Sequence, residues 1–184
     1  MFEILLPFSL LVLLLFALFI IWRTNARKYI SSVTVASAYD AWTQDKLLER
    51  LWGEHIHLGF YPSGKKDIDF RKSKVQFVHE LVKWSGLDKL PKGSRVLDVG
   101  CGIGGSSRIL AKYYGFNVTG ITISPAQVKR ARELTPHELN CNFQVMDALD
   151  LKFEDGSFDA VWSVEAGAHM NDKSKFADEM LRTL

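Results

Sequence analysis

The sequence predicts an α/β fold with a doubly wound, Rossmann-like parallel sheet. Two observations support this: from Arg95 onward apolar strand patterns alternate with helix patterns, and a glycine-rich turn follows the first strand. That strand is expected over Val96 to Val99, and the helix after the turn over the residues up to Tyr114, with Gly115 just past its end. A strand, a glycine turn and a helix in this order are typical of folds that bind a cofactor at the turn.

The elements that follow repeat this alternation. The second strand is expected over Asn117 to Ile123, and Ser124-Pro-Ala-Gln127 opens the next helix with a capping residue, an early proline and a glutamine spaced for a capping box. Further expected elements are a third strand, a fourth strand after a turn and a final helix, at Asn142 to Met146, Asp159 to Val164 and from Lys173. In a sheet of four such strands, an edge strand with the apolar pattern of a buried strand would have no neighbour to cover it. We therefore predict that the sequence is a fragment of a longer chain, truncated after strand four.

The first residues have a different composition. From Ile4 to Trp22 the chain is uncharged and almost wholly apolar, and as a helix it would span about 28 Å, close to the hydrocarbon thickness of a bilayer. We predict a transmembrane anchor over residues 1–22. A cleaved signal peptide is the alternative, but the positive charges follow the apolar run at Arg23, Arg27 and Lys28. The positive-inside rule then predicts a single-pass membrane protein with its domain on the cytoplasmic side.

Three segments are expected after the anchor: a juxtamembrane linker over residues 23–35, an N-terminal helical cap over 36–90, and the sheet domain over 91–184. Within the cap, one helix is expected from Ala36 to Leu51 and another from Lys72 to Trp84. Between them lies WGEHIHLGFY, residues 52–61, which is rich in aromatic residues and histidine.

The net charge and the cysteine positions limit the classes of function that the sequence supports. A net charge of +2 is too small to indicate a nucleic-acid partner, which requires a concentrated basic face. The two cysteines, Cys101 and Cys141, have no metal-ligand spacing and fit a reduced, cytosol-facing domain.

The glycine turn fits two cofactor patterns at once. Gly100, Gly102 and Gly105 satisfy the dinucleotide pattern G-x-G-x-x-G, whereas Asp98, Gly100, Gly102 and Gly104 satisfy the D-x-G-x-G-x-G pattern of S-adenosylmethionine sites. Charge favours the second pattern, because a carboxylate at position 98 would oppose a pyrophosphate and attract a cationic methyl donor.

The ends of the next two strands supply further candidates. Thr122 stands where an acidic residue usually accepts hydrogen bonds from the ribose, and a hydroxyl there can still pair with a ribose hydroxyl. Asp147, followed by Ala148, offers a carboxylate to the adenine amino group. The alternative is that Asp98 and Asp147 only cap turns.

Four blocks of the sequence resemble the tocopherol and sterol group of class I methyltransferases: WGEHIHLGFY, VLDVGCGIGGSSRILA, GFNVTGITISPAQVKRA and FDAVWSVEAGAHM. The resemblance implies a class I methyltransferase sheet and an enzyme that transfers a methyl group from S-adenosylmethionine to the ring of a prenylated hydroquinone, without a metal, in tocopherol (vitamin E) biosynthesis. Carried over by position, it assigns the methionine part of the cofactor to Asp98, Gly100, Gly102 and Gly104. It assigns the ribose to Thr122 with Ile123, and the adenine to Asp147 with Ala148.

Two positions depart from the plant tocopherol enzymes of this group. Leu58 stands where those enzymes usually have a further histidine, and Ala168 where they have a glutamate. The differences favour 2-methyl-6-phytyl-1,4-hydroquinone as the acceptor over γ-tocopherol or another quinol. A nicotinamide-dependent oxidoreductase and a cofactor-binding module without turnover remain as alternatives of other classes.

Methylation of a phenolic ring carbon benefits from a general base, because loss of the hydroxyl proton makes the ring more nucleophilic. The candidates are His55 and His57 in the early patch, and Glu165 and His169 just past the fourth strand, at the end of the sheet where ligands bind. His55 and His57 are equally consistent with packing in the cap. Tyr39 is a candidate for contact with the methionine carboxylate.

Overall fold

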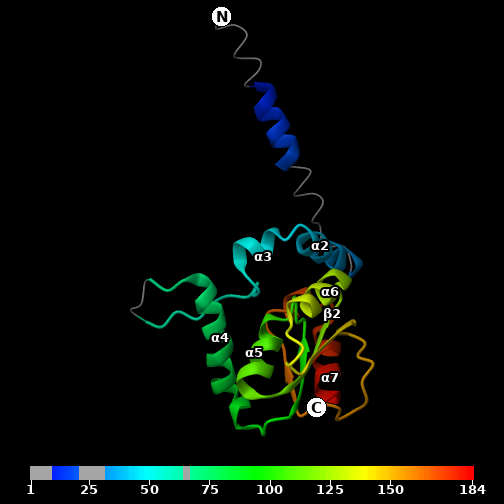
Figure 1. The fold of residues 1–184 in the computed structure, drawn as a ribbon. Helices are drawn as coiled ribbons and strands as arrows, with labels where there is room; N and C mark the ends of the chain where they lie inside the picture. Colours follow the sequence, from blue (N-terminus) through cyan, green and yellow to red (C-terminus); the bar gives the residue numbers. More distant parts are fainter. Residues whose placement is uncertain (1–9, 21–31, 64–66) are drawn as a thin grey trace, which may run out of the picture.

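The computed structural model describes residues 10–20, 32–63 and 67–184. A four-stranded parallel sheet in the order β3-β2-β1-β4 lies at its centre (Figure 1), so the predicted α/β fold is confirmed. The strands are β1 Arg95–Val99, β2 Asn117–Thr122, β3 Cys141–Val145 and β4 Ala160–Trp162. The fourth strand is shorter than predicted, since the Ser163 hydroxyl donates to the Val99 carbonyl at 3.0 Å immediately after the strand ends.

Helices cover both faces of the sheet, because successive side chains of a strand point to opposite faces. Val96 of β1 packs in one core with Val78 of α4 (Phe70–Ser85) and Leu110 of α5 (Gly105–Tyr114). Its neighbour Leu97 packs on the other face with Phe176 of α7 (Lys173–Arg182). Figure 1 shows the sheet between α5 and α7.

Local signals set the helix ends as predicted. In α6 (Pro125–Leu134) the Ser124 hydroxyl caps the first turn by accepting from the amide of Gln127, and Gly115 ends α5 in a left-handed conformation. The predicted reciprocal half of the capping box is wrong: the Gln127 side chain accepts from the Thr122 hydroxyl at 2.7 Å.

The N-terminal segment differs from its prediction. The expected helix over 36–51 is two helices, α2 (Ser32–Gln44) and α3 (Leu47–Trp52). Lys46 adopts a left-handed φ of 54°, and the Asp45 carboxylate accepts from the Leu47 amide, so a turn stabilised by Asp45 interrupts the helix. The helix α2 begins at Ser32, within the segment predicted as a linker over residues 23–35.

The predicted membrane span lies partly in residues 1–9 and 21–31, outside the described residues. Residues 10–20 are helical with exposed apolar side chains. Across the described ranges, no helix combines the length and apolarity that crossing a bilayer requires. The proposed domain boundaries stay a prediction, although α4 contributes Val78 and Val82 to the same core as the sheet.

Candidate cofactor and acceptor pocket

A pocket of about 290 Å³ lies at the carboxyl ends of the strands, where ligands bind in open α/β sheets. The structure gathers almost all predicted site residues around it. Those lining it are Asp98, Gly100, Gly102, Thr122, Ile123, Asp147, Ala148, His55, His57, Glu165 and His169.

Gly104 is the predicted residue that does not line the pocket. It precedes α5 with a φ of 80°, and a Cβ there would lie 2.7 Å from Cζ of Phe143. Its role is therefore to let the turn pack against β3. Gly105 lines the pocket instead, and a Cβ on it would lie 2.6 Å from the Glu54 carbonyl oxygen. This glycine allows the early histidine patch to approach the turn.

Asp98 contributes a buried carboxylate to the lining of the pocket. Its side chain is 2% exposed and accepts a 2.6 Å hydrogen bond from the Ser107 hydroxyl. Burial raises the pKa of Asp98 to about 6, against the smaller lowering effect of the Ser107 hydrogen bond. Within the described ranges no lysine or arginine forms an ion pair with it. A cationic ligand group would therefore stabilise its ionised form.

The amino terminus of α5 lies beside Asp98. Gly105 and Ser106, in its first turn, both line the pocket. The first amides of a helix lack partners within the helix and attract anions. Together, Asp98 and this helix end offer sites of opposite polarity, which suits the ammonium and carboxylate of an amino acid.

Thr122 is a weaker ribose candidate than the sequence indicated. Its hydroxyl donates to Gln127 Oε1 at 2.7 Å and accepts from the Ser124 amide at 3.3 Å, so it retains one acceptor position. Gln127 is buried, lines the pocket and was missed as a site residue. Its position in the Ser-Pro-Ala-Gln turn, directly after the second strand, could have indicated a site residue, but from the sequence this glutamine was assigned to helix capping alone.

The two early histidines form a directed hydrogen-bond chain. His57 Nδ1 lies 2.7 Å from the Leu58 carbonyl oxygen, which can only accept, so this nitrogen carries a proton. In the neutral ring Nε2 is then an acceptor, and His55 Nδ1 donates to it at 3.1 Å. Burial, together with nearby His57, Arg108 and Lys74, lowers the pKa of His55 to about 3, and burial also lowers the pKa of His57. The lowered pKa values make both rings poor proton acceptors, and Nε2 of His57 already accepts from His55, so the two histidines are weak candidates for the general base.

Glu165 joins the early patch to the loop after β4. Its carboxylate accepts from the Leu58 amide at 3.0 Å, across 107 residues of chain. Its φ of 57° lies in the left-handed region, which is uncommon for a residue with a side chain and is often found at functional sites.

His169 lies on the short 3₁₀ turn Gly167–His169, and its Nε2 is 3.0 Å from the Tyr39 hydroxyl of α2. The two rings also meet edge to face, with centroids 5.7 Å apart. Burial, with a smaller contribution from Glu165, raises the pKa of Tyr39, so the phenol is neutral at pH 7. Tyr39, on α2, thus contacts a candidate base in the loop after β4.

Three polar contacts hold the segment from α2 to His57 over the pocket. Asp40 accepts from the Ser124 hydroxyl and from the Ala126 amide at 3.0 Å, at the amino end of α6. The Arg130 guanidinium binds both oxygens of Glu49, at 2.6 and 2.8 Å. The buried Arg108 forms an ion pair with Glu54. Figure 1 shows α2 beside α6, and the two helices are in contact.

The parallel sheet, the glycine turn and the pocket at the strand ends define a class I methyltransferase fold. Comparisons with known proteins agree: residues 97–184 match the methyltransferase domain family.

The chain is 62% identical over 164 residues to a 2-methyl-6-phytyl-1,4-hydroquinone methyltransferase of Synechocystis, covering 89% of this chain and 52% of that one. It is 44% identical over 146 residues to a chloroplastic tocopherol O-methyltransferase of Arabidopsis thaliana, covering 74% and 42% respectively. The chain thus spans about half the length of these curated relatives. The resemblance to the tocopherol group is confirmed.

A solved structure with the same fold carries the product of the methyl donor. It is a Haemonchus contortus phosphoethanolamine N-methyltransferase in complex with S-adenosylhomocysteine. The identity is 26% and the TM-score 0.60, over 74% of this chain and 29% of that one. This agrees with S-adenosylmethionine as the cofactor that the glycine turn and Asp98 indicated.

Proposed function

We propose that this protein transfers a methyl group from S-adenosylmethionine to a ring carbon of a prenylated hydroquinone, 2-methyl-6-phytyl-1,4-hydroquinone, in tocopherol biosynthesis. The observation that carries the proposal is the buried Asp98 carboxylate, which lacks a cationic partner among the described residues and lies beside the amino end of α5. The acceptor follows from the 62% identical relative. The name of that relative gives the ring and its phytyl tail.

S-adenosylmethionine supplies a methyl group activated by a sulfonium. In the proposed complex, Asp98 binds the ammonium, and the first amides of α5 bind the carboxylate. Thr122 and Gln127 bind the ribose, and Asp147 with Ala148 contacts the adenine. The Asp147 carboxylate is held for this by its own turn, in which Oδ1 accepts from the Leu149 amide at 2.9 Å.

His169 is the proposed base for the acceptor hydroxyl, and Tyr39 orients it. Tyr39 can orient the base throughout the reaction if His169 Nε2–H donates to the Tyr39 oxygen, because Nδ1 is then the nitrogen of the neutral ring that accepts the proton. Glu165, in the same loop and also lining the pocket, is the proposed partner of the second ring hydroxyl. The buried His55 and His57 line the pocket, and their lowered pKa values favour the neutral rings.

Membrane attachment is part of the proposal. The helical residues 10–20 expose leucine and phenylalanine side chains, and a phytyl tail gains about 0.8 kcal/mol per methylene buried in a bilayer. An apolar N-terminal segment over residues 1–22 would hold the enzyme at the surface that contains its substrate, with the domain on the cytoplasmic side.

The test is incubation of the purified protein with S-adenosylmethionine labelled in the methyl group and a panel of prenylated quinols. We expect label in the ring of 2-methyl-6-phytyl-1,4-hydroquinone, with Asp98→Ala inactive. Transfer only to γ-tocopherol would change the assigned acceptor. Binding of NADH in place of S-adenosylhomocysteine would refute the class of enzyme. Flotation with lipid vesicles, compared with a variant lacking residues 1–22, tests the attachment.

A further inference from the structure

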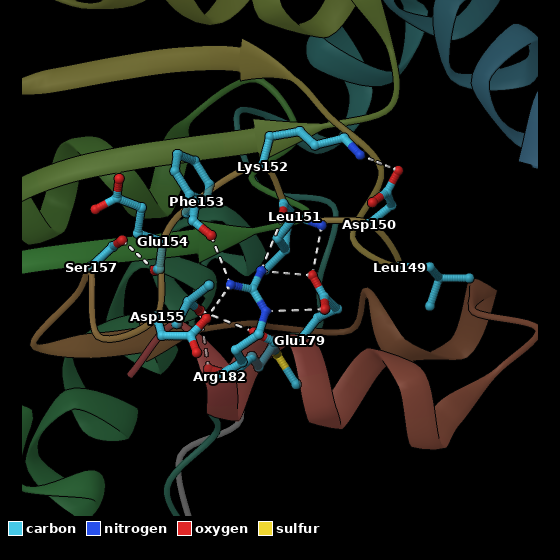
Figure 2. A network of polar contacts seen from close by, with 12 residues as sticks. Leu149, Asp150, Leu151, Lys152, Phe153, Glu154, Asp155, Ser157, Glu179 and Arg182 are labelled. Atoms are coloured by element: carbon cyan, nitrogen blue, oxygen red, sulfur yellow. Dashed lines mark hydrogen bonds and ion pairs between the residues drawn. The ribbon is translucent and has the colours of Figure 1, made fainter.

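Arg182, the last residue of α7, is the centre of a polar network on the loop between β3 and β4 (Figure 2). Its guanidinium donates to the carbonyl of Phe153 at 2.7 Å and to that of Leu151 at 3.0 Å. It also pairs with the carboxylates of Asp155 at 2.7 Å and Glu179 at 3.0 Å. One side chain therefore binds the loop at three successive odd positions, 151, 153 and 155.

Glu179, one turn earlier on α7, completes the attachment. Its Oε2 accepts from the Leu151 amide at 2.8 Å, so both backbone groups of Leu151 are bound by α7 side chains. The backbone at the carboxyl end of α7 contributes as well: the Arg182 carbonyl accepts from the Gly156 amide, and the carbonyl of Thr183, just after the helix, accepts from the Phe158 amide. Residues 146–159 contain no helix or strand, so these contacts replace the hydrogen bonds that a regular element would supply.

The first residues of the same loop form part of the pocket wall. Met146, Asp147, Ala148 and Leu149 line the pocket, and Leu151 is buried two residues further on. The turn that begins at Asp147 leads directly into residues 151–155, which Arg182 binds, since the Asp150 amide donates to the Asp147 carbonyl at 3.1 Å. A shift of the backbone at Leu151 therefore moves the residues to which the adenine contact is assigned.

We propose that Arg182 is a positioning residue for the adenine end of the cofactor. It touches no ligand itself and acts by fixing the loop that carries Asp147 and Ala148. The inference rests on the proposed function, because it takes the ligand of this wall to be an adenine. A planar guanidinium is required, since a lysine cannot bind two carbonyls and two carboxylates in one plane.

The test compares Arg182→Lys with Arg95→Lys. Arg95 is the matched control: it too binds a carboxylate through two nitrogens, with Asp159 Oδ1 at 2.7 Å and Oδ2 at 3.3 Å, but at the opposite end of the strands. Affinities for S-adenosylhomocysteine and S-inosylhomocysteine are measured by calorimetry. The second ligand replaces the amino group of adenine with an oxo group, so the ratio of the two affinities reports the adenine contact alone. Glu179→Gln, a milder change to the same network, is the second variant, and urea unfolding confirms that each is folded.

We expect Arg182→Lys to weaken S-adenosylhomocysteine about tenfold, or about 1.4 kcal/mol, and S-inosylhomocysteine much less. Glu179→Gln should shift the ratio in the same direction and Arg95→Lys should leave it unchanged. Amide hydrogen exchange of the unliganded Arg182→Lys protein should be faster at Leu149 to Asp155. If the wild type binds S-adenosylhomocysteine and both network variants keep its affinity ratio, Arg182 has no positioning role and the proposed function stands. If the wild type binds neither nucleoside, the proposed function and the positioning role both fail.

Discussion

Replacing Asp98 by asparagine should remove the pH dependence of cofactor binding. In the free protein burial raises the pKa of Asp98 to about 6, and a bound ammonium lowers it again by stabilising the carboxylate. The form that binds the ammonium is the ionised one. At pH 5 a group with a pKa of 6 is ionised in about one molecule in eleven, so the apparent affinity should be about tenfold lower than at pH 7.5.

The assay is calorimetric titration with S-adenosylhomocysteine from pH 5 to 8. In the wild type, affinity should rise with pH and level off above about 6, with protons released on binding at the lower values. Asp98→Asn should bind more weakly and nearly independently of pH. Ser107→Ala should move the inflection upward, since it removes the hydrogen bond that lowers the pKa. An equally steep pH dependence in Asp98→Asn would show that another group causes it and would refute the reasoning.

The same raised pKa has a consequence for folding. Between about pH 4 and 6 the folded protein holds a proton on Asp98 that the unfolded chain has lost, so this contribution to stability is present below pH 4 and disappears as pH rises through 6. The shift corresponds to about 3 kcal/mol. Asp98→Asn should therefore unfold at higher urea than the wild type at pH 8, and this difference should shrink towards pH 4.

Three further changes test the packing around the pocket. Gly104→Ala should cost about 2–4 kcal/mol in urea unfolding, from its left-handed φ and its approach to Phe143; a fully stable variant would contradict this. Tyr39→Phe should lower turnover about tenfold, the value of one oriented hydrogen bond to His169, with cofactor affinity kept. Unchanged turnover would remove that contact from the mechanism. Asp40→Ala should cost about 1 kcal/mol by removing the second cap of α6, and Asp40→Asn should restore part of it.

The sheet and the glycine turn were predictable because their signals are local. Apolar runs bounded by glycine and capping residues place β1, α5 and the start of α6 within one or two residues. The break at Lys46 was missed, because Ala36 to Leu51 has continuous helical spacing and the Asp45 turn depends on a single side-chain hydrogen bond. The sequence pattern alone does not show whether one such hydrogen bond stabilises a turn more than the helix propensity of the same residues stabilises a continuous helix.

Most of the predicted site residues line the pocket, but the contacts between them were not predicted. The glycine pattern and the strand ends identified most of the pocket wall. The pairing of Tyr39 with His169 joins positions 130 residues apart, and no local pattern reports a contact of that kind. The neutral state of His55 likewise follows from burial by Gly105 and Lys74, which becomes visible only in three dimensions.

The attachment of the segment from α2 to His57 has a consequence for synthesis of the chain. Its anchoring partners Arg108, Ser124 and Arg130 are translated 54 to 84 residues after the side chains they bind. At about 5–20 residues per second, the segment leaves the ribosome several seconds before those partners exist. During that interval its apolar side chains have no sheet domain to pack on. The cofactor pocket is therefore among the last features of this part of the protein to form, and any contact that shields the segment meanwhile must be released before the pocket can close.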